Sequence, residues 1–212
     1  MSDVILEKLF GGEATVKVLR LFLFNENLAL TQEEIASKVH TNFEWTKNAI
    51  DYLEKLGFFK KRSGFRDFPI KNGKKGHKTV KKRMALWLVN PNFPMTDALR
   101  QFFHRANIVS PKEVISKLSS TGNLKLITIS GMFLEDNEAR LDLLVVGDNL
   151  KKASFDKGVG AIEALLGREI RYATFETPEF LYRYGMYDRL VRDVFDYKHE
   201  KILNKLAIFG EN

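Results

Sequence analysis

Hydrophobic residues near the start of the chain recur at helical spacing in three segments. The first segment, 2–27, carries a wide apolar face and is interrupted at Gly11-Gly12. The second follows Thr31, whose hydroxyl and the Glu34 carboxylate have the spacing of a capping box. The third ends at Gly57, and its apolar stripe repeats at three and four residues: Thr46, Ala49, Ile50, Leu53 and Leu56. About three residues separate the last two helices, which is the spacing of a helix-turn-helix.

The pattern changes after Gly57. Segments 58–62 and 83–89 have the composition of strands, and the basic, glycine-containing stretch 63–82 between them is expected to form the long tip of a hairpin. A proline-containing turn then leads into a further helix over 95–106. This order predicts a helix-turn-helix followed by a β wing.

The second half of the chain alternates strand-like and helical segments. A short helix is expected over 111–118, with Pro111 in its first turn. Three apolar strands and two helical regions follow: strands 124–129, 141–146 and 170–175, a helix over 150–166 and a final helical region over 177–204. Such alternation favours a mixed or parallel sheet covered by helices. The 212 residues therefore predict an α+β chain of two domains, 1–106 and 107–212, the second a small α/β domain with a mixed sheet.

Positive charge is unevenly distributed between the two halves. Residues 1–106 hold 19 Lys and Arg against 11 Asp and Glu, whereas residues 107–212 hold 15 against 16. Window 60–83 contains one acid, Asp67, and a dense group of cations: Lys60, Lys61, Arg62, Arg66, Lys71, Lys74, Lys75, Lys78, Lys81, Lys82 and Arg83. Such a density is typical of a surface that binds a polyanion, either nucleic acid or anionic lipid. The alternative is a solvated basic loop without a partner.

The composition excludes several kinds of site. There is no Cys, so disulfides, thiolate zinc sites and cysteine nucleophiles are ruled out, and a reducing, cytoplasmic setting is expected. The longest apolar runs, such as 21–24, fall far short of the ~20 residues of a membrane helix, and no membrane partner is expected. The four histidines, His40, His77, His104 and His199, lack metal-ligand spacing, so neither a metal nor a cofactor is predicted.

Segments 31–36 and 49–59 match the second helix and the end of the recognition helix of the winged helix-turn-helix family, which residues 13–90 resemble. The resemblance implies that the recognition helix enters the major groove of DNA. The residues opposite its apolar stripe are Asn42, Glu44, Trp45, Lys47, Asn48 and Asp51.

These exposed positions suggest how the helix would read DNA. Asn42 and Asn48 suit adenine, and Lys47 suits guanine or a phosphate. Trp45 could contact a thymine methyl group or, alternatively, pack in the core. Glu44 and Asp51 would repel phosphates, so the basic window is expected to supply most of the electrostatic attraction.

Four segments of the second half, 129–133, 140–148, 167–172 and 177–180, resemble the nucleotidyltransferase superfamily, in particular small domains fused to winged helices in microbial regulators. Active members have a Gly-Ser turn for the triphosphate and an Asp-x-Asp pair that holds two magnesium ions. Here Gly131 is kept, but Met132 replaces the serine and Arg140 the first aspartate, which leaves Asp142. At best Glu169 could serve as the third carboxylate, so the resemblance implies an inactive scaffold with no catalytic residues.

The two resemblances together predict a transcriptional regulator that binds double-stranded DNA. Homodimerisation is expected through the apolar segments 2–10 and 95–106. The degenerate domain would then serve dimerisation, sensing or binding of a protein partner, and the tyrosine-rich segment 180–187 is a possible partner surface. The alternative is an active nucleotidyltransferase that modifies a protein or nucleic acid and is targeted by the winged helix. In a third interpretation, the basic window contacts RNA or a membrane.

Overall fold

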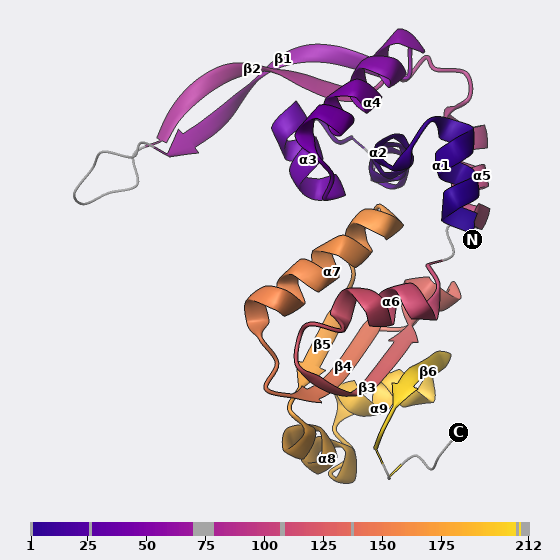
Figure 1. Cartoon of the computed structure of the whole chain (residues 1–212), viewed down its shortest axis with the longest axis vertical. Coiled ribbons are helices and arrows are strands. Elements are labelled where there is room, and N and C mark those ends of the chain that lie inside the picture. Colours follow the sequence, from indigo (N-terminus) through magenta and orange to yellow (C-terminus); the bar gives the residue numbers. More distant parts are fainter. Residues whose placement is uncertain are drawn as a thin grey trace. The chain divides into compact units, whose positions relative to one another are not determined.

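The structure is a computed structural model and describes residues 2–25, 27–69, 79–106, 109–136, 138–206 and 208. The chain divides into two compact units, Met1–Ala106 and Asn107–Asn212. Over the described residues it is a mixed α/β protein with nine α-helices and two small sheets. Figure 1 shows the fold of each unit. Five residues singled out above lie outside the described residues: Lys71, Lys74, Lys75, His77 and Lys78.

Four helices open the first unit, as their apolar spacing predicts: α1 (Ser2–Phe10), α2 (Glu13–Phe24), α3 (Gln32–Val39) and α4 (Phe43–Lys55). The break between α1 and α2 lies at Gly11 and Gly12, which have φ of 82° and 133°. Both values fall in the region that only glycine adopts easily, so the interruption has a local cause. The predicted capping box is also confirmed, because the Thr31 hydroxyl accepts from the Glu34 amide and the Glu34 carboxylate accepts from the Thr31 amide.

Strands β1 (Phe59–Pro69) and β2 (Thr79–Val89) pair antiparallel and project from α3 and α4 as a long hairpin (Figure 1). The expectation that all of 63–82 forms the tip is wrong, because 63–69 and 79–82 continue the two strands. Charged residues have low strand propensity, but in a ribbon exposed to water their side chains stay hydrated while the backbone pairs. Trp87 of β2 also pairs with Leu30, which precedes α3. Helix α5 (Thr96–Ala106) completes the unit.

The core of the first unit is formed by the inward faces of these elements. Its most deeply buried members come from five different elements or their edges: Val18, Ile35, Ile50, Phe58 and Phe103. Leu56, expected in the apolar stripe of α4, is instead 53% exposed because the helix has ended by this position. Trp45 is 63% exposed, so the alternative that placed it in the core is wrong.

The second unit contains a four-stranded mixed sheet in the order β5-β4-β3-β6. Its strands are β3 (Asn123–Ser130), β4 (Leu143–Asp148), β5 (Tyr172–Phe175) and β6 (His199–Asn204). Strand β5 runs parallel to β4, and the other pairs are antiparallel. The prediction of helix throughout 177–204 is wrong at its end, because His199–Asn204 adds to the sheet beside β3. Pairing with a strand distant in sequence decides the conformation of this short segment, and no local signal records it.

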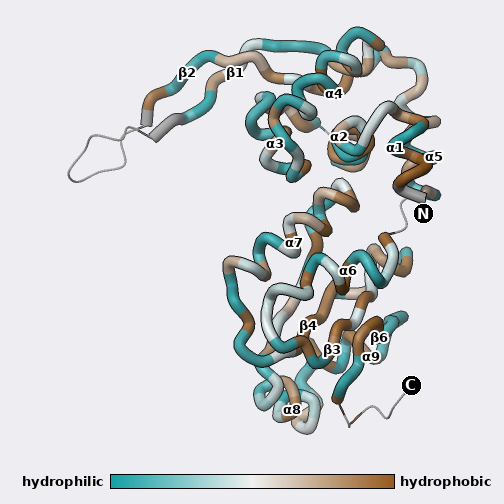
Figure 2. Tube along the Cα trace, in the orientation of Figure 1, coloured by the Kyte–Doolittle hydropathy of each residue, from teal (hydrophilic) through white to brown (hydrophobic). Residues whose placement is uncertain are grey.

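Helices cover both faces of this sheet, which is why its central strands are apolar at successive positions. Ile127 and Val145 belong to the core formed with α6 (Pro111–Leu118) and α7 (Lys152–Leu166). Their alternate neighbours belong to the core formed with α8 (Thr177–Gly185) and α9 (Arg189–Asp196). Figure 2 shows hydrophobic residues gathered on β3 and β4, whereas much of the hairpin is hydrophilic. No helix in the described parts of the chain is long and apolar enough to cross a membrane.

Candidate nucleic-acid interface and the Asp142 site

The residues expected to read DNA lie on the exposed side of α4. Thr46, Ala49, Ile50 and Leu53 are buried, whereas the positions between them are open to solvent. The exposed positions among the candidates are Asn42, Glu44, Trp45, Lys47 and Asn48, and Asp51 is half-buried. The helical period thus places these side chains outside the core, as predicted.

Asn42 has a structural role at the start of α4. Its side-chain oxygen accepts a hydrogen bond of 2.8 Å from the Glu44 amide, so Asn42 is the N-cap residue. A change at this position would remove a cap contribution of about 1 kcal/mol along with any contact to a ligand. Lys47 and Asn48 carry no such role and are the cleaner candidates for base contacts.

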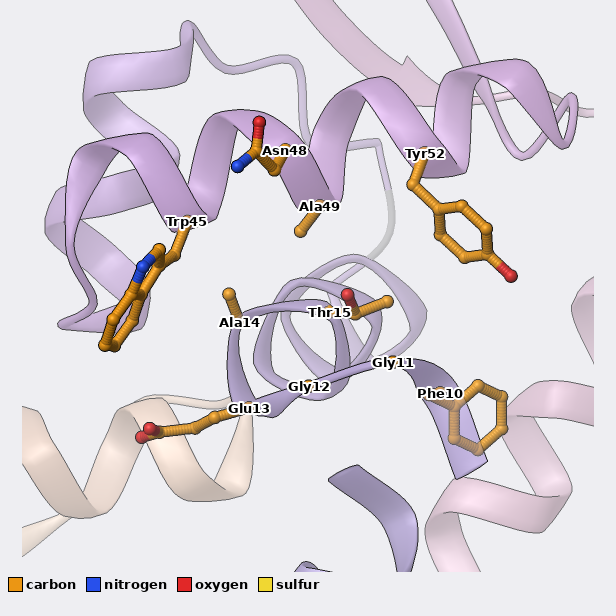
Figure 3. A pocket seen from close by; sticks show the side chains of 10 residues that line it. All are labelled: Phe10, Gly11, Gly12, Glu13, Ala14, Thr15, Trp45, Asn48, Ala49 and Tyr52. Atoms are coloured by element: carbon orange, nitrogen blue, oxygen red, sulfur yellow. The ribbon is translucent and has the colours of Figure 1, made fainter. Parts of the chain in front are cut away.

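Trp45 and Asn48 also border a groove between α4 and the start of α2 (Figure 3). The groove has a volume of about 490 Å³, and Tyr52 lines it from the same side of α4. Ala49 faces α2 at its centre, where a small side chain lets the two helices approach each other (Figure 3). Tyr52 is 51% exposed, so this side of α4 presents two accessible aromatic rings beside an amide.

Two of the predicted basic residues anchor the hairpin. Arg66 places its Nε 2.6 Å from Glu34 Oε1 on α3 and also donates to the Ala29 carbonyl. Lys61 places its Nζ 2.8 Å from Glu54 Oε2 on α4, and that same oxygen accepts from the indole of Trp87. These contacts join both strands of the hairpin to the helices, so Arg66 and Lys61 orient the ribbon.

The carboxylates of both anchors are stabilised in their charged form. Partial burial alone would raise the pKa of Glu34, but hydrogen bonds from Arg66 and from the Thr31 amide outweigh it and lower that pKa. In the same way, burial opposes the hydrogen bonds from Lys61 and Trp87, which together lower the pKa of Glu54. Protonation of either carboxylate would therefore weaken the attachment of the hairpin.

We expect Glu34→Gln to lower the free energy of unfolding by about 0.5–1 kcal/mol near neutral pH, since this pair is partly exposed. Glutamine still suits the capping box, so the variant removes mainly the charge that faces Arg66. Because the folded chain lowers the pKa of Glu34, the stabilisation is present above its ordinary value and is lost as pH falls through the lowered one. Urea unfolding followed by tryptophan fluorescence should therefore show a larger difference near pH 7 than near pH 3.

Glu33→Gln is the matched control for this experiment, because Glu33 is an exposed neighbour on the same helix. Its effect should be small at both pH values. An equal deficit of Glu34→Gln at neutral and acid pH would show that the carboxylate charge does not hold the hairpin.

The other described cations of the hairpin are exposed: Lys60, Arg62, Lys81, Lys82 and Arg83. The register distributes them over both faces of the ribbon, because Arg83 lies opposite Phe65 and Lys82 lies opposite Arg66. The two strands together contain a single acid, Asp67, which lies opposite Lys81. The ribbon thus presents a positive surface that can follow a line of phosphates.

Asp142, the surviving carboxylate of the transferase resemblance, is fully buried just before β4. Its Oδ1 accepts from the Met132 amide and from Arg171 Nη2, both at 2.9 Å. Its Oδ2 accepts from the Arg171 amide at 2.8 Å and from Arg171 Nε at 3.1 Å. The two oxygens therefore receive four hydrogen bonds, and a bidentate guanidinium neutralises the charge.

The chain around Asp142 is built to hold this arrangement. Parallel pairing of β4 with β5 brings Arg171 beside Asp142, and the Asp142 amide donates to the Arg171 carbonyl at 2.7 Å. Gly131 has φ of 53° and leaves no room for a Cβ against the carboxylate. The hydrogen bonds that the Arg171 guanidinium donates to Asp142 raise the pKa of Arg171, against the effect of its partial burial. Arg171 thus remains charged over the ordinary pH range.

The remaining transferase positions do not meet at Asp142. Arg140 Nε lies 2.9 Å from Asp193 Oδ2 on α9, and Glu169 is exposed. Met132 takes part through its backbone amide, not its side chain. Across the residues the structure describes, no group of three His, Asp or Glu side chains could hold a metal ion.

Comparison of the chain with protein-family models, with curated proteins and with solved structures finds no match. Functional inference therefore rests on the geometry. The sequence does not reveal that Arg171 binds Asp142, that Arg66 binds Glu34 or that Glu54 binds Trp87. In each of these pairs the two residues are at least twenty-nine positions apart. The one local signal for Arg171 is its place beside the apolar Ile170 in a polar stretch, which marks it as an outward-facing residue. Only the pairing of β5 with β4 shows that it reaches Asp142.

Proposed function

We propose that the first unit is a winged helix-turn-helix domain that binds duplex DNA. The observation that carries the proposal is the basic ribbon β1–β2, fixed to α3 and α4 by the Arg66 and Lys61 contacts. Helix α4 would lie in the major groove and expose Lys47 and Asn48 to base edges, while the ribbon contacts the backbone. A sequence-specific regulator of transcription is the function that this division of roles supports best.

The charges of α4 favour duplex DNA over a general polyanion. Glu44 and Asp51 lie among the candidate reading residues, and carboxylates there oppose contact with phosphates or anionic headgroups. Carboxylates can, however, accept from cytosine amino groups in the major groove. The helix is therefore suited to base edges and the ribbon to phosphates.

For the second unit we propose a catalytically inactive nucleotidyltransferase-like scaffold. The bidentate Arg171–Asp142 pair supports this role, because a guanidinium takes up the carboxylate lone pairs that a magnesium ion would need. The scaffold would then contribute to assembly or partner binding. We propose further that the regulator is a homodimer, since α1 and α5 expose apolar side chains: Val4, Ile5, Leu9 and Phe102.

The test is titration of the full chain with duplex DNA at several salt concentrations. If six phosphates are contacted, the slope of log affinity against log salt should be about −5. Single-stranded RNA and vesicles with anionic headgroups serve as comparisons and should bind more weakly than the duplex. A duplex slope shallower than about −2 would mean that the ribbon does not lie on the DNA.

A further inference from the structure

The described part of the hairpin carries an exposed aromatic side chain, Phe65, halfway along β1. Its exposed fraction is 65%, among the highest of the large hydrophobic side chains. A phenylalanine in this position contributes little hydrophobic stabilisation to the folded chain, because its ring stays in water. The ring is accessible to a partner, and its surroundings indicate which kind of partner it suits.

The neighbours of Phe65 fix the direction of its ring. Gly64 and Arg66 point to the opposite face of the ribbon, where Gly64 packs against the buried Leu86 and Arg66 binds Glu34. Because the Arg66 side chain is held on that face, Phe65 points to the other face, on which Lys61 and Trp87 contact α4 nearer the base of the hairpin. At the level of Phe65 this second face is open to solvent, so the ring is presented outward.

The face that carries Phe65 is cationic and has small residues beside the ring. Arg83 lies directly opposite Phe65 on β2, and the next pair on this face toward the tip is Asp67 and Lys81. The next pair toward the base is Ser63 and Ala85, both exposed and too small to cover the ring. An apolar ring that rises above small residues and is flanked by cations fits a polyanion with an apolar interior. The centre of a protein interface, in contrast, is usually depleted of charge.

We propose that Phe65 inserts between base pairs of duplex DNA from the minor groove and kinks the duplex. The inference rests on the proposed DNA binding and adds to it a mode of binding, in which the ribbon lies in the minor groove. Arg83 and Lys81 would contact the phosphates on either side, while the ring separates two stacked base pairs. Steps that unstack easily, TA and CA/TG, would then be favoured over stiff A-tracts.

The experiment uses the full chain and end-labelled duplexes of about 30 base pairs, whose bend is measured by energy transfer between the ends. One duplex set carries a central TA step, and the other is a continuous A-tract. Wild-type protein should bend the TA duplex by about 20–90°. It should prefer that duplex about fivefold, which corresponds to about 1 kcal/mol.

Phe65→Ala should abolish both the bend and the preference, whereas Phe65→Leu should retain much of each, because leucine also acts as a wedge. Val80→Ala is the matched control, since Val80 is a 44% exposed apolar residue on the opposite face of the same ribbon. It should leave both readouts unchanged. Because Phe65 is exposed, none of these variants should alter the unfolding midpoint.

The possible failures are distinguishable. A straight TA duplex in a wild-type complex, or an equal bend with Phe65→Ala, would overturn the wedge and leave the proposed DNA binding intact. A change in the sedimenting mass of the free protein on Phe65→Ala, with bending preserved, would assign the ring to contact between protein copies and also overturn it. Failure of the wild-type chain to bind any duplex would overturn the proposed function and the wedge together.

Discussion

A chain in which Lys60, Arg62, Lys81 and Arg83 are all changed to glutamine is expected to bind duplex DNA about a thousandfold more weakly near 0.1 M salt. Each of these side chains is exposed on the hairpin. If each neutralises one phosphate, its loss removes about 0.9 from the salt slope, so the slope should become shallower by 3 to 4 units. Fluorescence anisotropy at several salt concentrations measures both effects.

Stability should be unaffected by this change, since the two cations that anchor the hairpin, Lys61 and Arg66, are kept. The matched control removes the same charge from the second unit through the exposed lysines Lys112, Lys151, Lys152 and Lys157. That control lowers the net charge equally and should retain nearly all of the affinity and of the slope. Equal losses in the two variants would show that net charge, and not the ribbon, drives binding.

The recognition helix should behave in the opposite way. Lys47→Ala combined with Asn48→Ala is expected to weaken a cognate site by about 1–3 kcal/mol and to leave scrambled duplex almost unchanged. Both side chains are exposed, so the variant should remain folded. A uniform loss across all sequences would mean that α4 does not read base edges.

The elements that could be predicted from the sequence are those whose capping residues and apolar spacing lie within a short segment. The α3 start follows from Thr31 and Glu34, and α6 follows from Pro111 and the apolar spacing after it. The exposed side of α4 follows from the helical period, which places Lys47 and Asn48 outside the core. In each case the determining residues lie within a few positions of one another, where backbone geometry alone relates them.

The features that could not be predicted depend on residues far apart in the sequence. Strands β1 and β2 are long because they pair with each other. The composition of these charge-rich segments does not indicate that pairing. Strand β6 exists because β3 offers it an edge, and the segment 199–204 alone gives no reason to end the helical region. Arg168, Glu169 and Arg171 are all polar residues beside Ile170, and only the parallel register of β5 with β4 brings Arg171 to Asp142.

Asp142→Ala should lower the free energy of unfolding of the second unit by about 3–5 kcal/mol. Removal of the carboxylate leaves the Met132 and Arg171 amides without their acceptor and leaves the Arg171 guanidinium without its counter-charge. Asp142→Asn should be nearly as damaging. Its amide nitrogen would face two donors in either orientation, because all four partners of Asp142 donate.

The positions of the two tryptophans make it possible to assign this loss of stability to one unit. Both tryptophans, Trp45 and Trp87, belong to the first unit, whereas helices and strands of both units contribute to far-ultraviolet circular dichroism. In urea, Asp142→Ala should shift part of the dichroism transition to lower denaturant and leave the tryptophan transition where it is. Coincident shifts of the two signals would show that Asp142 supports the stability of the whole chain.

Arg171→Ala distinguishes the structural role of Asp142 from a catalytic one. The loss of stability should be smaller than for Asp142→Ala, because the carboxylate keeps two backbone donors and Arg171 is about half exposed. The loss of stability in the double variant should be smaller than the sum of the losses in the two single variants, since each single change already breaks the same ion pair.

If Asp142 were instead a metal ligand of an active transferase, Mg²⁺ with a nucleoside triphosphate should stabilise the Arg171→Ala variant. The same variant should then support nucleotide transfer, and Asp142→Ala should abolish that transfer. With Arg171 in place, we expect neither stabilisation nor transfer, because the guanidinium already occupies the carboxylate oxygens that the ion would need.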